Sequence, residues 1–316
     1  MEILEKIMAV MMGHVVADAL GVPVEFQGRE ELDLNPVVDM RGFGTYSVPA
    51  GSWSDDSSMA IATLDSLACG TVDFDDIMRR FIAWSFNNEY TPTGYVFDIG
   101  GACSTAISDY YFGKRPATSC GGVGDYSNGN GSVMRIHPVV LYSYVKGLGT
   151  EEWLDLVAGV GCLTHGHERS EIGCGIYSFV LMELLHTARR ESIYVGLEKA
   201  AEHYKSFAEL KHYSRIFDPE FEFTDRADIK SSGYVVDSLE AAIWCLITTD
   251  NYKDCVLRAV NLGLDTDTVA AIAGGLAGAL YGYGAIPSDW LETVINKEYI
   301  ENMCERALAS WQNNNI

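Results

Sequence analysis

Two short clusters of side-chain oxygens stand immediately before apolar helical patterns. The first lies in "WSDDSSM" and the second in "LDTDTV", and together they contain Ser54, Asp55, Asp56, Asp265, Asp267 and Thr268. Carboxylate and hydroxyl oxygens are the ligands that Mg²⁺, Mn²⁺ and Ca²⁺ prefer. Neighbouring residues on a helix point about 100° apart, so Asp55 and Asp56 could reach two adjacent cations. Both clusters are therefore candidates for a metal centre.

The same clusters are also ordinary helix-capping sequences, in which a Ser or Asp side chain accepts a backbone N–H. Capping is the more common role for each cluster taken singly. Two clusters that each lead into an apolar helix leave capping and metal binding about equally supported. If they converge, the four aspartates would bring about four negative charges together and raise several pKa values. Two divalent cations would compensate that charge, bind hydroxyls or phosphates, and activate a water.

A third segment, "SNGNGSVMRIHP", has the composition of a tight turn. Gly129 and Gly131 free the backbone, and Asn128 and Asn130 favour turns. Exposed N–H groups in such a turn could bind an anion near the start of a helix. The alternative is a plain helix-entry turn, because the segment lacks the lysine of a P-loop and is not GxGxxG.

Composition limits the possible partners. The 316 residues include 44 acidic and 22 basic side chains, a net charge of -22. Nonspecific binding to DNA, RNA or anionic membranes is not expected, because it requires Lys and Arg. With 48% apolar and 21% charged residues, the chain should form a folded globular body. We expect a single domain over residues 1–316, with a possible insertion at about 198–228, where the pattern is weakest.

The N-terminus carries acidic residues early and does not resemble a signal peptide. No stretch reaches the roughly 20 uninterrupted apolar residues of a membrane span, and residues 269–286 come nearest. Eight cysteines are scattered without CxxC spacing. Buried thiols are more consistent with that pattern than disulfides or zinc ligands, and we expect a reducing, cytoplasmic location.

Helical periodicity dominates the chain. An amphipathic helix is predicted over residues 1–21, with Leu4, Ile7, Met8, Met11 and Val15 on one face, and an extended, turn-rich connection follows over 28–53. Further helices are predicted from Ser54 and over 74–86, 150–163, 231–249 and 266–282, with a glycine-rich region over 95–131. Only "VVLYSYV", residues 139–145, is ambiguous between strand and helix.

Seven segments taken in order resemble the ADP-ribosylglycohydrolase family. They read "MMGHVVADALGVPVEF", "GSWSDDSSM", "FDIGGACSTA", "GNGSVMRIHP", "LTHGH", "SGYVVDSLEAAIW" and "VNLGLDTDTVAAIAGGLAGALYG". The resemblance covers residues 10–285, nearly the whole chain. The resemblance implies an all-α fold, a compact orthogonal multi-helix bundle. It also implies two divalent cations, Mg²⁺ or Mn²⁺, and hydrolysis of the bond between C1″ of ADP-ribose and an acceptor. The partner would be an ADP-ribosylated protein or small ADP-ribosyl conjugate, with ADP-ribose as product.

The resemblance also assigns roles to individual residues. Ser54, Asp55 and Asp56 resemble one metal-ligand set of the family, and Asp265, Asp267 and Thr268 resemble the other. Glu25 resembles a glutamate near the metals. Glu25 or Asp56 would hold the attacking water, and Asp98 would assist proton transfer or ring opening. The segment that holds diphosphate and ribose is matched by Gly129, Asn130, Gly131, Ser132 and Met134, and His165 resembles a histidine of the same cleft.

The chain departs from the family pattern at two positions. Ser54 stands where the family usually has threonine, which keeps the oxygen ligand. Leu264 stands where it usually has glycine, and would be strained if the backbone there needs a positive φ. The alternatives to hydrolysis are an inactive ADP-ribose-binding or crystallin-like structural relative and a metal-dependent nucleotide-diphosphate phosphohydrolase. The acceptor linkage, the target protein, the choice of metal and the oligomeric state do not follow from the sequence.

Overall fold

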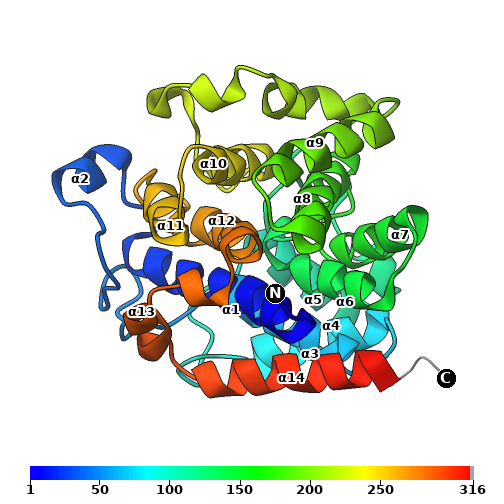
Figure 1. Cartoon of the computed structure of the whole chain (residues 1–316). Coiled ribbons are helices and arrows are strands. Elements are labelled where there is room, and N and C mark those ends of the chain that lie inside the picture. The colour runs from blue at the N-terminus through cyan, green and yellow to red at the C-terminus, as the bar shows by residue number, and fades with distance from the viewer. Residues whose placement is uncertain (314–316) are drawn as a thin grey trace.

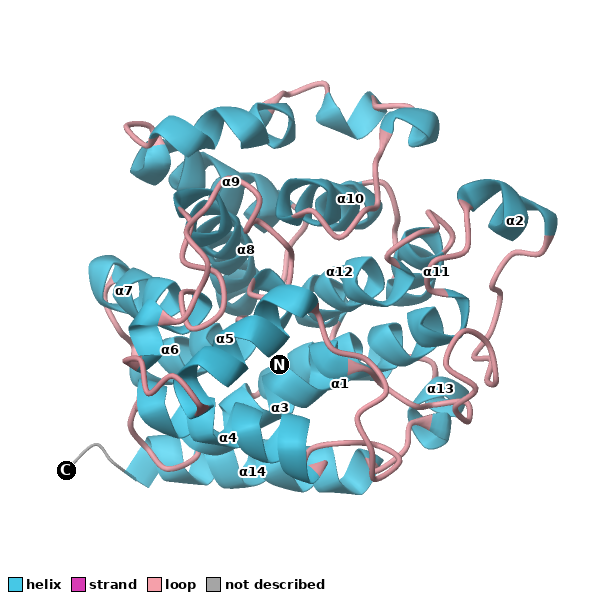
Figure 2. Cartoon of the chain, turned by 180° about the vertical axis from the view of Figure 1, so that it is seen from behind, coloured by secondary structure: helices cyan, strands magenta, loops and turns pink. Residues whose placement is uncertain are grey.

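The computed structural model describes residues 1–313, and the last three residues of the expected domain, 314–316, lie outside them. The α-helices are α1 (Ile3–Gly21), α2 (Arg29–Leu34), α3 (Asp55–Leu67), α4 (Phe74–Asn87), α5 (Gly101–Tyr111), α6 (His137–Lys146), α7 (Thr150–Gly161), α8 (Glu168–Thr187), α9 (Glu191–Tyr204), α10 (Val235–Ile247), α11 (Tyr252–Val260), α12 (Thr266–Tyr281), α13 (Ser288–Thr293) and α14 (Lys297–Asn313). Short 3₁₀ helices are η1 (Val22–Val24), η2 (Ala117–Ser119), η3 (Val133–Arg135), η4 (Ala208–Phe217), η5 (Phe221–Phe223), η6 (Arg226–Asp228) and η7 (Tyr283–Ala285). Residues 1–313 contain two isolated β-bridges and no strand, which confirms the all-α prediction (Figure 2).

Helices α1 and α12 lie at the centre of the bundle, and the other helices surround them (Figure 1). Glycines let the two backbones touch. A Cβ atom at Gly278 would lie 1.9 Å from the carbonyl oxygen of Ala9, and one at Gly274 would lie 2.3 Å from that of Gly13. No larger residue fits such a crossing without moving a helix.

The burial of α1 corrects the sequence analysis. The predicted amphipathic face exists only in the first turns, and residues 9–24 are buried on all sides. The reason is that α12, α14, α3 and α6 all pack around it. By length and composition alone, Ile3–Val24 is apolar enough to cross a membrane, rather than the predicted 269–286. Within the protein, 94% of the apolar window in Ile3–Val24 is buried.

Three other segments are more helical than expected. The connection over 28–53 contains α2, and the glycine-rich region over 95–131 contains α5. The ambiguous "VVLYSYV" forms most of α6, where Val139, Val140 and Leu141 are buried against α3 and α8. β-Branched residues favour strands only weakly, and tertiary packing overrides that preference here.

The weakly patterned residues 198–228 continue α9 and then form the 3₁₀ helices η4, η5 and η6. This segment lies across α10 at the top of Figure 1. Within this segment, the side chains of Tyr213, Ile216 and Phe221 are buried, and Arg215 forms an ion pair with Glu240 of α10. The segment is therefore attached to the bundle by its own apolar contacts.

All eight cysteines are free thiols, and six of them are buried. This agrees with the expectation drawn from their spacing.

The contact between α1 and α12 yields the first prediction. Gly278→Ala should lower the free energy of unfolding by about 1–3 kcal/mol, because the added methyl group would overlap the Ala9 carbonyl. Gly284→Ala is the matched control, since a Cβ atom there meets nothing within 4 Å. Urea denaturation of both variants measures the difference. Equal stability of the two would show that the helices can separate without cost.

Candidate metal centre and active site

The start of α3 presents its two aspartates in different directions. Ser54 caps the helix as predicted, since its hydroxyl accepts from the Asp56 N–H at 3.3 Å. The Asp56 Oδ2 atom accepts from the Ser54 hydroxyl and from the Thr268 hydroxyl, both at 3.1 Å. The Asp55 carboxylate instead accepts from the Gly100 N–H at 3.0 Å. Asp56 thus joins the two oxygen clusters, while Asp55 faces the segment around Asp98.

The start of α12 is not a simple cap. Asp265 occupies the N-cap position, but its side chain accepts no N–H of that helix. Its carboxylate accepts from the Asn130 amide at 2.7 Å. Asp267 accepts from the Thr268 N–H through Oδ1 at 2.9 Å, while its buried Oδ2 has no protein partner. These two aspartates therefore keep oxygens that local capping does not use.

Two groups of carboxylates could each hold a cation. Asp18, Asp56 and Asp267 form one group and Glu25, Asp265 and Asp267 the other, with ligand oxygens within 4.8 Å of one another in each. Asp267 belongs to both. The structure thus brings together the two sequence clusters and Glu25. Asp55 lies in neither group, so its role as a ligand stays a prediction.

Asp18 is a site residue that the sequence analysis missed. It is fully buried on α1 and accepts from the N–H groups of Ser54 and Ser57 at 3.0 and 3.1 Å, and from the Ser57 hydroxyl. The available signal was a lone aspartate in the apolar run "MMGHVVADALGV", because acidic residues are rarely buried without a specific partner. Asp18 positions the start of α3 against α1.

The carboxylates gathered around Asp267, here called the acidic centre, have no basic partner. None of the ion pairs within residues 1–313 involves Asp18, Glu25, Asp55, Asp56, Asp98, Asp265 or Asp267. Burial, followed by mutual repulsion, raises the pKa values of Asp56 and Asp267 well above the ordinary range. Asp56 Oδ1 and Asp267 Oδ2 are buried without hydrogen-bond partners. Hard divalent cations fit such a donor set, because they replace the missing partners and compensate the charge.

Glu25 and Asp98 lie at the edge of this centre. Burial and the neighbouring Asp98 raise the pKa of Glu25 to about 8, and its Oε2 accepts from the Tyr46 hydroxyl at 2.5 Å. Burial also raises the pKa of Asp98, and the neighbouring Tyr46 and Asp55 offset part of that rise. Tyr46 was not singled out from the sequence, because nothing local distinguishes it in a turn-rich connection.

The predicted turn over 129–134 packs beside the acidic residues. Asn130 bonds to Asp265, and its N–H donates to the carbonyl of Gly233 at 3.1 Å. Gly129 and Gly131 lie against the His165 ring, since a Cβ atom at these positions would be 3.3 and 2.9 Å from it. Ser132 and Met134 are buried, and the Met134 N–H donates to the Asn130 carbonyl.

His165 is buried, so the structure places it under the turn. Burial and the nearby Arg135 lower its pKa to about 3, which keeps the imidazole neutral. Its Nδ1 lies 2.8 Å from the Thr164 hydroxyl.

Leu264 has the backbone conformation that the sequence analysis marked as strained. Its φ is +64°, in the left-handed region, and its side chain is 48% exposed. Phe26 has φ +67°, and its N–H donates to the Leu264 carbonyl at 2.7 Å. Two strained residues thus flank the carboxylates of Glu25 and Asp265, and such strain is concentrated at functional sites in proteins.

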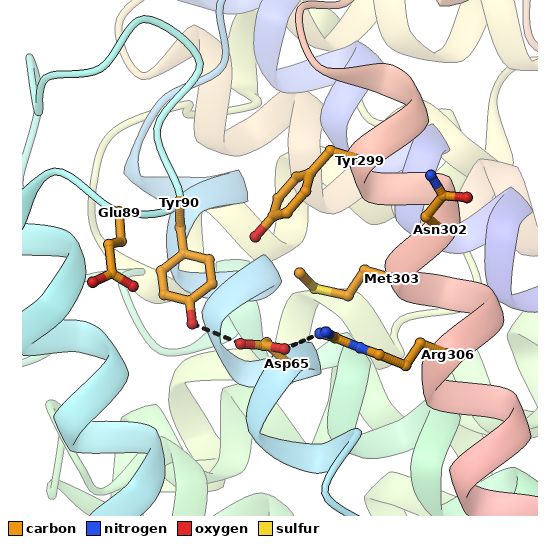
Figure 3. Close-up of a pocket in the computed structure, with 7 residues that line it drawn as sticks. All are labelled: Asp65, Glu89, Tyr90, Tyr299, Asn302, Met303 and Arg306. Carbon is orange, nitrogen blue, oxygen red and sulfur yellow. Dashed lines mark hydrogen bonds and ion pairs between the residues drawn. The ribbon is translucent and has the colours of Figure 1, made fainter.

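A cavity of about 460 Å³ between α3 and α14 shows the opposite electrostatic arrangement (Figure 3). Asp65, near the other end of α3, pairs with Arg80 and Arg306 and accepts from the Tyr90 hydroxyl at 2.7 Å. Its charge is therefore compensated by protein groups. This carboxylate fixes α3 in place, whereas those at the start of the same helix remain available to a ligand.

Comparison with known proteins agrees with this arrangement. The sequence profile of the ADP-ribosylglycohydrolase family matches residues 1–315. The chain belongs to that family. It is a hydrolase of the family's glycosidase type.

Individual relatives match over nearly the whole chain. An ADP-ribosylarginine hydrolase, Tri1, from Serratia proteamaculans is 32% identical over 306 residues, covering 96% of this chain and 79% of that protein. An ADP-ribosyl-[dinitrogen reductase] glycohydrolase from Rhodospirillum rubrum is 30% identical, covering 91% and 89%. A solved structure of an ADP-ribosylglycohydrolase-related protein complex superposes with a TM-score of 0.81 at 28% identity, covering 98% of both chains. This superposition confirms the predicted fold class.

The acidic centre predicts an unusual dependence of stability on pH. In the metal-free protein, the free energy of unfolding should rise as the pH falls from above 8 to 6.5, by on the order of 1 kcal/mol per pH unit. Glu25 gains its proton near pH 8 in the folded state but only near 4.5 when unfolded. Below 6.5, His14 acts in the opposite direction, because burial lowers its pKa to about 4. Urea denaturation at several pH values measures the effect.

Mg²⁺ or Mn²⁺ should remove this dependence and stabilise the protein most at pH 8, where the carboxylates are ionised. Asp267→Asn is the informative comparison, since it should be more stable than wild type without metal and less responsive to metal. Metal-free stability that rises with pH between 6.5 and 8 would contradict the interpretation.

Leu264 permits a separate test of backbone strain. Leu264→Gly should unfold with a free energy about 1 kcal/mol higher than Leu264→Ala, because only glycine adopts a positive φ without cost. The usual order at an unstrained position is the reverse. Thermal denaturation shows which of the two variants is more stable. A more stable alanine variant would exclude strain at this position.

Proposed function

We propose that this chain hydrolyses the bond between C1″ of ADP-ribose and the arginine side chain of a modified protein, releasing ADP-ribose. Two divalent cations, Mg²⁺ or Mn²⁺, would be its cofactors. The observation that supports this most strongly is that Asp267 is shared by two groups of carboxylates, each able to hold one cation. The Serratia proteamaculans relative, an ADP-ribosylarginine hydrolase, supports arginine as the acceptor. Small ADP-ribosyl conjugates would be further substrates, and the free thiols support a cytoplasmic location.

The metal-holding residues would be Ser54, Asp55, Asp56, Asp265, Asp267 and Thr268, with Asp18 and Glu25 beside them. When bound, the cations supply positive charge that stabilises the ribose hydroxyls and the charge developing in the transition state. They also offset the repulsion between an acidic protein and a diphosphate. The remaining steps depend on side chains of the chain itself.

In the reaction, the C1″–N bond breaks, a water oxygen bonds to C1″, and a proton reaches the departing guanidine nitrogen. Bound cations would lower the raised pKa of Glu25 and keep it ionised. Glu25 would then orient the water and take its proton, because Tyr46 donates to one of its oxygens and leaves the other free. Asp98, whose pKa burial raises, would hold a proton near the leaving group. Asp56 is the alternative holder of the water, since Ser54 and Thr268 donate to its Oδ2 and leave its Oδ1 free.

The ADP-ribose part would lie along the turn over 129–134. Gly129 and Gly131 let the turn lie directly on the His165 ring, and Asn130 ties it to Asp265. Ser132, Met134 and His165 would support the shape of this turn from beneath, consistent with their burial. Backbone N–H groups in such turns bind diphosphate without a basic side chain.

The proposed function is tested with ADP-ribosylarginine on a protein, with Mg²⁺ or Mn²⁺ present. We expect intact ADP-ribose as product, identified by mass, and a loss of at least about 100-fold in rate for Asp267→Ala or after chelation. Substrates linked through serine and O-acetyl-ADP-ribose define the acceptor. Release of AMP would instead indicate a phosphohydrolase, and tight ADP-ribose binding without turnover would indicate an inactive binding protein.

A further inference from the structure

Aromatic rings form a continuous row beside the acidic centre. The ring centroids of Phe26 and Tyr46 are 6.4 Å apart, those of Tyr46 and Phe97 are 5.1 Å apart, and those of Phe97 and Tyr95 are 6.4 Å apart. The row joins three segments that are distant in sequence, namely the chain after η1, the loop before α3 and the loop before α5. The row lies outside the apolar core, since Phe26 is 67% and Tyr95 46% exposed.

The row is attached to two carboxylates by the covalent chain and by hydrogen bonds. Phe26 directly follows Glu25, and Phe97 directly precedes Asp98. Between them, the Tyr46 hydroxyl donates to Glu25. The aromatic rings therefore lie directly beside the acids that we assign to the reaction.

The conformation of Phe26 is energetically unfavourable. Its ring is 67% exposed, and its backbone has φ +67°, which is unfavourable for an aromatic residue. The backbone of Leu264, also strained, holds it in place. A large ring kept exposed on a strained backbone gains nothing from the hydrophobic core, which indicates contact with a ligand.

Flat aromatic faces beside unpaired carboxylates suit a flat organic cation. A guanidinium group stacks on aromatic rings and donates N–H groups to carboxylates in the same plane. We propose that Phe26, Tyr46 and Phe97 form the subsite that holds the guanidinium of the arginine acceptor. This inference rests on the proposed function, to which it adds the residues that select the acceptor. A serine acceptor has neither the charge nor the flat surface to use this row.

The test measures binding of agmatine, a guanidinium compound, to the protein loaded with Mg²⁺ and ADP-ribose, by saturation-transfer NMR titration. Cadaverine, a flexible diamine without a guanidinium group, is the comparison ligand. We expect agmatine to bind more tightly than cadaverine, and Phe26→Leu and Phe97→Leu each to weaken it by about threefold. Phe223→Leu is the matched control, because Phe223 is 72% exposed in η5, away from the acidic centre.

The hydrolysis assay separates this inference from the proposed function. With protein-linked ADP-ribosylarginine, Phe26→Leu should raise KM and leave kcat nearly unchanged. This is the result expected when a contact is lost that holds the bound substrate and the transition state equally. Phe26→Leu is decisive because its exposed ring can be removed without disturbing the core. Unchanged agmatine binding in this variant, with normal arginine hydrolysis by wild type, would overturn the subsite and leave the function standing. Ring-dependent agmatine binding without hydrolysis would support the subsite and reject the function.

Discussion

The close contact between α1 and α12 is the constraint on which the acidic centre depends. Gly21 lies so near the start of α12 that a Cβ atom there would be 2.4 Å from the Asp267 backbone, and the Thr266 hydroxyl donates to the Gly21 carbonyl at 2.8 Å. Asp18, one turn earlier on α1, is thereby fixed beside Asp267. The apolar packing of two central helices holds carboxylates together that would separate on their own.

The electrostatics follow from that enforced proximity. Carboxylates at the starts of α3 and α12 lie near the positive ends of both helices, which offsets part of their repulsion. The offset is incomplete, since burial and neighbouring acids raise the pKa values of Asp55, Asp56 and Asp267. The folded protein therefore contains a local destabilisation that a bound divalent cation would relieve. Folding stability and metal binding are coupled through the same atoms.

The sequence predicted the features that depend on local chemistry. The cap at Ser54, the start of α12 and the oxygen clusters follow from residue types and spacing, and the family resemblance linked them. Strain at Leu264 was also predicted, on the condition that its φ is positive. Asp18 and Tyr46 were not found, because their importance arises from contacts with residues far along the chain. The burial of α1 on all sides was missed for the same reason, since it depends on which helices surround it.

The backbone and the side chain of Leu264 contribute to different features of the protein. Its N–H and carbonyl bond to Gln27 and Phe26, and the adjacent Asp265 N–H donates to the Ser231 carbonyl. The position of Asp265 is thus set by main-chain bonds, which do not involve the side chain of residue 264. The exposed side chain of residue 264 can consequently change without moving the Asp265 carboxylate. Surface chemistry at this position is therefore independent of the geometry of the acidic residues beneath it.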